Sequence, residues 1–275
     1  MKPIAQDFTD ECNALQRILA DVLNSSRNNP LALSTQFKNW TISDVLIHLH
    51  MWNLAAVLSL QEGDGFSVFF ADVASAMMAG KSHRDMAREW AAEKFGGDDI
   101  KLFAAWSDYY PKLAQNYQQM DPDTRLQWVG TSMSARDSLI ARQMETWAHG
   151  QAVFDVFGLV RRETDRIRNI AHLGVKTYSW TFKVRQLNAP KPKPFVRLTA
   201  PSSSVWTWNG EQADNCIKGS ATEFCQVVTQ TRNIADTSLE VVGAAAELWM
   251  ANAQCFAGGA ETPPAKGLRF CSPAS

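Results

Sequence analysis

The stretch Ser134-Ala-Arg-Asp-Ser-Leu-Ile-Ala-Arg-Gln-Met-Glu145-Thr-Trp-Ala-His149-Gly predicts one long helix. Residues four apart lie one above the other on the same face of a helix, so Glu145 and His149 can reach a common point. Two histidines use the same spacing in the helices of zinc proteases. Because carboxylate and imidazole groups both bind divalent metals, this pair is a candidate half of a metal site.

A third ligand has to come from a distant segment, and His48 is the candidate. It lies in the stretch WTISDVLIHLHMW, where Thr41 followed by Asp44 has the spacing of a capping box. This spacing predicts a helix that begins at Thr41 and runs to about Gln61. His48 shares a strip of that helix with Asp44, whereas His50 points roughly to the opposite side. One helix therefore cannot offer both histidines to one ion, and His48 is the better candidate.

Composition excludes several classes of function. The chain has 275 residues, 45% of them hydrophobic and 20% charged, with a formal net charge of −1. Its scattered Lys and Arg give no electrostatic footprint for nucleic acid, and no run approaches the roughly 18 apolar residues of a membrane span. The polar start is unlike a secretory signal, and the five cysteines form no CxxC pair. We therefore expect a cytoplasmic protein that binds neither nucleic acid nor membranes.

Hydrophobic periodicity predicts an antiparallel helical bundle in the first part of the chain. Its long helices are expected at 4–24, 41–61, 99–119 and 134–158, with shorter helical stretches at 66–79 and 82–90. A loop, Leu126 to Gly130, is expected to open the last long helix. The cores of such bundles are where facing helices assemble metal sites.

After about residue 165 the pattern changes. A helical stretch to about Gln186 is followed by the stiff, proline-rich connector 189–194. A period of two then predicts strands. We expect an α+β two-domain protein with domains at 1–165 and 166–275, the boundary falling within 159–194. The second domain is expected to contain strands at 195–200 and 205–210, a helix that opens with Gly219-Ser220, a strand from Leu239 and a helix at 244–256.

Two segments resemble signatures of one family. WTISDVLIHL around His48 resembles the second-helix signature of the N-terminal fold of mycothiol-dependent maleylpyruvate isomerases, in the DinB-like superfamily, and ARQMETWAHGQA resembles the second signature. The resemblance implies that His48, Glu145 and His149 bind one divalent metal at one end of a four-helix bundle. Residues 219–259 resemble the family's C-terminal domain, which implies a small α+β fold of the sterol-carrier type. The chain most resembles a subgroup of predicted metal-binding proteins.

The resemblance implies a function as well. Zinc is the expected metal, with nickel or iron as alternatives suited to the same ligands. Three protein ligands leave a coordination position open, where a low-molecular-weight thiol would be held as a thiolate that attacks an electrophile. We expect a thiol-dependent transferase or isomerase acting on a small-molecule substrate. There are two alternatives. The protein could be a non-catalytic one that binds a metal and a small ligand, or the metal ion could serve only to stabilise the fold.

Two arginines are candidates for binding a substrate. Arg142 lies one turn before Glu145 and could bind a ligand carboxylate, although a surface salt bridge is an equal alternative. In the resembled isomerases an Arg follows the helix of the C-terminal domain; by register that position is Thr231 here, and the adjacent Arg232 could substitute. Asp44 could orient His48, but capping is its better-supported role. An exposed apolar helix face would favour a homodimer.

Overall fold

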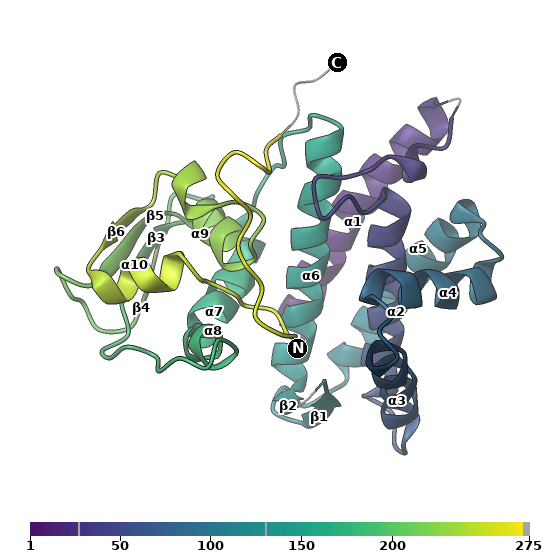
Figure 1. Ribbon diagram of the computed structural model, residues 1–275, viewed down its shortest axis with the longest axis horizontal. Helices are drawn as coiled ribbons and strands as arrows, with labels where there is room; N and C mark the ends of the chain where they lie inside the picture. The colour runs from purple at the N-terminus through teal and green to yellow at the C-terminus, as the bar shows by residue number, and fades with distance from the viewer. Residues whose placement is uncertain (27, 130, 272–275) are drawn as a thin grey trace. The chain divides into compact units, whose positions relative to one another are not determined.

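The computed structural model describes residues 1–26, 28–129 and 131–271 and combines helices with small sheets (Figure 1). The contacts between Cα atoms divide the chain into two compact units, Met1–Val153 and Phe154–Ser275. The domain boundary expected between residues 165 and 166 stays a prediction.

Four long helices form the core of the first unit. Helix α5 contacts both α1 and α2, and side-chain contacts join α6 to the others. The Tyr117 hydroxyl on α5 lies 2.6 Å from the Ser138 hydroxyl on α6, and the Cys12 sulfur on α1 lies 3.8 Å from the Thr146 hydroxyl. His48 Nε2 on α2 lies 3.2 Å from Glu145 Oε2 on α6. These helices are α1 (Lys2–Ser25), α2 (Ile42–Leu58), α5 (Asp99–Gln118) and α6 (Ala135–Val156).

Local sequence signals mark the start of helix α2 and the end of helix α4. The capping box at the start of α2 is confirmed: the Thr41 side chain accepts from the Asp44 amide, and the Asp44 carboxylate accepts from the Thr41 amide. The helix ends at Leu58, earlier than predicted. Two shorter helices follow, α3 (Gly65–Met78) and α4 (His83–Phe95). Helix α4 ends at Gly96, whose φ of +64° favours glycine.

The predicted loop before α6 is a hairpin. Strand β1 (Arg125–Trp128) pairs antiparallel with β2 (Thr131–Ser134), with Leu126 opposite Met133. Burial alternates along β1, so that Leu126 and Trp128 face the interior. The loop prediction was therefore wrong for β1, because this strand is too short for its alternation to stand out. Gly130, where the predicted loop ended, lies outside the described residues.

The second unit is built on a four-stranded sheet with the order β4-β3-β5-β6. Strands β3 and β5 are parallel, and the other neighbours are antiparallel. The strands are β3 (Phe195–Thr199), β4 (Val205–Trp208), β5 (Cys216–Ser220) and β6 (Glu240–Val242). The helices are α7 (Arg168–Lys176), α8 (Tyr178–Lys183), α9 (Ala221–Val228) and α10 (Ala244–Met250). Short 3-10 turns lie at Asp165–Ile167 and Ile234–Asp236 in this unit and at Pro30–Ala32 in the first unit.

Three details of the second unit correct the sequence prediction. The helix expected to 186 is two helices, α7 and α8, which break at Thr177. Gly219 and Ser220 end strand β5 instead of opening a helix. Gly219 has a φ of +142°, and a Cβ there would lie 2.8 Å from the Leu239 side chain, so glycine is required by both conformation and space. Helix α10 ends at Met250, six residues earlier than expected.

Candidate metal centre

Helices α2 and α6 bring the three predicted ligands together. Glu145 Oε2 lies 3.2 Å from His48 Nε2 and 3.4 Å from His149 Nε2, and one ligand atom from each residue lies within 4.8 Å of the others. Ligands at about 2.0–2.2 Å from a tetrahedral zinc ion are separated by about 3.3–3.5 Å. The two distances to Glu145 fit that spacing. Two imidazoles and one carboxylate are also the protein donor set of known catalytic zinc sites.

The three candidate ligands are mostly buried but not completely enclosed. The side chains of His48, Glu145 and His149 are 14%, 17% and 11% exposed, so solvent reaches part of each. In the described part of the chain, His48 Nδ1 is buried with no hydrogen-bond partner. Asp44 therefore does not orient His48, and its predicted capping role is the one the structure shows.

The charges at this cluster suit a cation. Burial, together with the neighbouring His149, lowers the pKa of His48 to about 3, and Glu145 only partly opposes this shift. Burial alone would raise the pKa of Glu145. Hydrogen bonds with His149 and His48 outweigh burial, so the pKa of this carboxyl lies well below its ordinary value. At neutral pH the cluster thus combines a neutral His48 with an ionised Glu145.

An aromatic wall, defined by Phe37, Trp40, Trp52 and His83, surrounds the ligands. The Phe37 ring meets His149 edge-on at 4.8 Å between centroids. Trp40 lies nearly parallel to His149, at 5.7 Å and 8°, and nearly parallel to His83, at 6.1 Å and 3°. The His83 centroid is 5.2 Å from that of His48. Sequence reasoning missed His83, which follows a polar segment with no motif to mark it.

Arg142 is buried on α6 beneath this site. Its guanidinium carbon lies 5.0 Å from the centroid of the Trp128 ring, and burial lowers the pKa of Arg142 from its ordinary value despite the nearby Glu145. A surface salt bridge, one of the two roles considered for this residue, does not fit a buried side chain. Its role as a binder of a substrate carboxylate stays a prediction.

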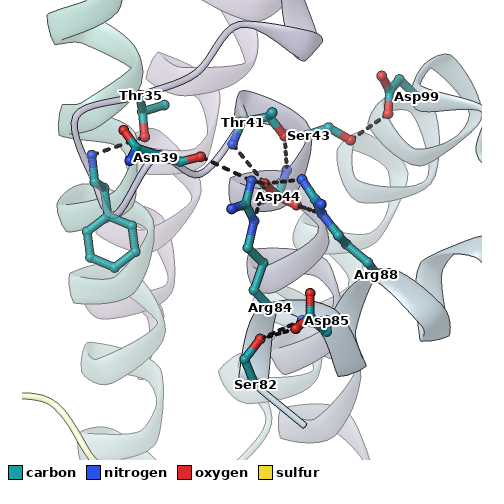
Figure 2. A network of polar contacts seen from close by, with 11 residues as sticks. Thr35, Asn39, Thr41, Ser43, Asp44, Ser82, Arg84, Asp85, Arg88 and Asp99 are labelled. Carbon is teal, nitrogen blue, oxygen red and sulfur yellow. Dashed lines mark hydrogen bonds and ion pairs between the residues drawn. The ribbon is translucent and has the colours of Figure 1, made fainter.

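Asp44 joins α2 to α4 at the edge of the site. Figure 2 shows its carboxylate between the guanidinium groups of Arg84 and Arg88. Arg88 Nε donates to Oδ1 at 2.5 Å, and Arg84 Nε donates to Oδ2 at 2.9 Å. Arg84 also donates to the backbone carbonyl of Asn39 at 3.0 Å. We call Asp44, Arg84 and Arg88 the Asp44 clamp, because it ties the helix that carries His48 to the helix that begins with His83.

Arg232 forms an ion pair within the second unit. Its two terminal nitrogens bind the two oxygens of Asp155 at 2.8 and 2.7 Å, and Asp155 is buried. The neighbouring Thr231 is buried and donates from its hydroxyl to the Gln226 carbonyl. A role for Arg232 in binding substrate stays a prediction.

His50 lies on the other side of α2 among Trp90, Phe95 and Tyr109, as expected.

Comparison with known proteins identifies the family. The family model described as the mycothiol maleylpyruvate isomerase N-terminal domain matches residues 12–154. The chain belongs to this family. Family membership confirms the resemblance predicted from the two signatures around the three ligands.

Other relatives of this family member are known by sequence and by structure. Uncharacterized proteins from two strains of Mycobacterium tuberculosis are 33% identical over 265 residues, which cover 96% of this chain and 98% of theirs. Crystal structures of a mycothiol-dependent maleylpyruvate isomerase and of its histidine-to-alanine mutant are 14% and 15% identical. Each match covers 82% of this chain and 87% of that chain, with a TM-score of 0.48. In the described ranges, no helix combines the length and apolarity needed to span a bilayer.

Proposed function

We propose that this family member binds one divalent metal ion, with zinc as the expected metal, through His48, Glu145 and His149. The supporting observation is the approach of Glu145 Oε2 to both Nε2 atoms at distances that match a metal-bound donor set. Nickel and iron are alternatives for the same ligands. We further propose that α1, α2, α5 and α6 constitute the DinB-like four-helix bundle and that the second unit is a domain of the sterol-carrier type.

We propose further that the chain is a thiol-dependent transferase or isomerase that acts on a small electrophile. A divalent ion with an open coordination position lowers the pKa of a thiol bound there, which is the chemistry the metal would supply. Membership of the family described as the mycothiol maleylpyruvate isomerase N-terminal domain supports a low-molecular-weight thiol as co-substrate. The partly exposed ligand side chains would let both molecules enter.

The protein's own groups have separate tasks in this proposal. His48 offers an unprotonated imidazole because burial holds its pKa low, and Glu145 supplies the negative charge. The positive charge of Arg142 helps to keep that carboxyl ionised. The aromatic wall shapes the space beside the ligands and limits the access of water.

Metal analysis of purified protein tests the metal site. We expect about one divalent ion per chain, lost in His149→Ala and retained in His172→Ala, a matched change at an exposed histidine of the second unit. Cobalt-substituted protein should change its visible spectrum when cysteine, glutathione or mycothiol is added. Equal metal content in the two variants would contradict the ligand assignment, and no response to any of the three thiols would contradict the thiol-dependent reaction.

Removal of the metal separates the enzyme from its alternatives. An enzyme loses turnover but keeps its fold, whereas a binding protein keeps its affinity for a small apolar ligand. If the ion is only a staple, its removal should unfold the first unit, because structural zinc contributes on the order of 10 kcal/mol to folding. Circular dichroism before and after chelation identifies a purely structural ion, and assays of turnover and of ligand binding on the metal-free protein separate the other two outcomes.

A further inference from the structure

His83 has a defined hydrogen-bonding state. Trp52 Nε1 lies 3.0 Å from His83 Nε2, and the two ring planes differ by 8°. A hydrogen bond between nearly parallel rings places them edge to edge in almost one plane. Trp40 lies parallel to His83 on another side, at 3°. The ring of His83 is therefore held by two tryptophans.

The tryptophan also determines which nitrogen of His83 carries the proton. The indole N–H can only donate, so His83 Nε2 must accept and must be unprotonated. The neutral ring then carries its proton on Nδ1. Within the described residues no hydrogen bond involves Nδ1, nor is this atom among the fully buried atoms that lack a partner. His83 thus presents an accessible N–H donor that no described residue accepts from.

This donor lies beside the candidate metal centre but outside its ligand set. The His83 and His48 centroids are 5.2 Å apart, and His83 Nε2 is occupied by Trp52. With one ionised carboxylate and two neutral imidazoles, a divalent ion would leave the centre with a net charge of about +1, which favours an anionic ligand. A substrate oxygen bound beside the ion would be stabilised by a hydrogen-bond donor within its reach.

We propose that His83 is a positioning residue for the substrate, whose Nδ1–H donates a hydrogen bond to a carboxylate or carbonyl oxygen bound next to His48. This inference rests on the proposed metal-dependent function. The Asp44 clamp supports it mechanically, because Arg84 and Arg88 fix α4, which begins at His83, against α2 (Figure 2). Arg84 also holds the carbonyl of Asn39, the residue before Trp40.

The tautomer can be tested without any metal. In metal-free protein, nitrogen-15 NMR of the imidazole should show His83 with an unprotonated Nε2 and a protonated Nδ1. Trp52→Phe, which removes the indole donor but keeps an aromatic ring, should release this preference. A protonated Nε2 in the wild-type protein would overturn the inference whatever the metal does.

Two variants test the role of the donor. His83→Asn keeps an amide N–H close to the position of Nδ1, whereas His83→Gln keeps a polar group near Nε2 and loses the donor at Nδ1. Acetate is the probe, titrated into cobalt-substituted protein and followed by the visible spectrum. We expect His83→Gln to weaken acetate binding about fivefold, as for the loss of one hydrogen bond, and His83→Asn to stay within about twofold of wild type.

The outcomes separate this inference from the proposed function. Failure of the wild-type protein to bind cobalt would overturn the metal site itself. Normal cobalt binding in every variant, with equal acetate affinity in His83→Gln and wild type, would overturn only the role of His83. Loss of cobalt from His83→Gln would also overturn it, since the residue would then act on the metal rather than on the ligand.

Discussion

Replacement of Asp44 by alanine should destabilise the first unit more than the loss of a helix cap alone. The carboxylate is 2% exposed and serves both as the capping partner of the Thr41 amide and as the acceptor for Arg84 and Arg88. Loss of a helix cap costs about 1 kcal/mol. The two arginines are partly exposed, so each ion pair contributes only about 0.5–1 kcal/mol. We therefore expect Asp44→Ala to lower the free energy of unfolding by about 2–3 kcal/mol.

Urea denaturation followed by tryptophan fluorescence measures this loss as a lower midpoint with an unchanged slope. The matched control is Asp98→Ala, which removes the aspartate that caps α5 by accepting from the amides of Ile100 and Lys101. This control loses a cap without an arginine clamp and should lose less stability than Asp44→Ala. Equal losses in the two variants would refute the contribution of the arginines.

The pH dependence of the same comparison gives a second test. Burial raises the pKa of Asp44, but hydrogen bonds from Arg88, Thr41 and Arg84 outweigh it, and the pKa lies below its ordinary value. A carboxyl with a lowered folded-state pKa stabilises the fold above its unfolded pKa of about 3.9. That stability is lost as the pH falls through the folded value. The difference in the free energy of unfolding between wild type and Asp44→Ala should thus be largest at pH 6 and should decrease below about pH 4. A difference that increases on acidification would contradict the assignment.

Two further predictions concern the second unit. Arg232→Ala should lower the free energy of unfolding by about 3 kcal/mol, because it leaves the Asp155 carboxylate buried without its bidentate partner. Denaturant unfolding should show that adding Asp155→Ala recovers part of this loss, and no recovery would argue against the ion pair. Gly174→Ala should destabilise by about 1–2 kcal/mol although alanine favours helices, because its Cβ would lie 2.8 Å from Val228. Thermal unfolding measures that loss, and Val228→Ala in the same chain should relieve it if the close approach is the cause.

Local signals in the sequence determined the positions of the long helices and two of the three candidate ligands. The capping box of Thr41 and Asp44 fixed the start of α2 because its hydrogen bonds join residues three apart. The four-residue spacing of Glu145 and His149 placed both on one face of α6 for a similar reason. The position of His48 on the same helix strip as Asp44 favoured it over His50, and the resemblance of its flanking segment supported the choice.

Only the tertiary structure decided which groups surround those ligands. Trp52 and His83 are 31 residues apart and Arg232 and Asp155 are 77 apart, and no local pattern records such pairs. The β1–β2 hairpin and strand β5 were missed because short strands are stabilised by pairing with a partner segment rather than by their own periodicity. Helix formation depends on residues that are close in the sequence. The tautomer of His83 instead depends on Trp52, which only the folded chain brings within hydrogen-bond distance of the His83 ring.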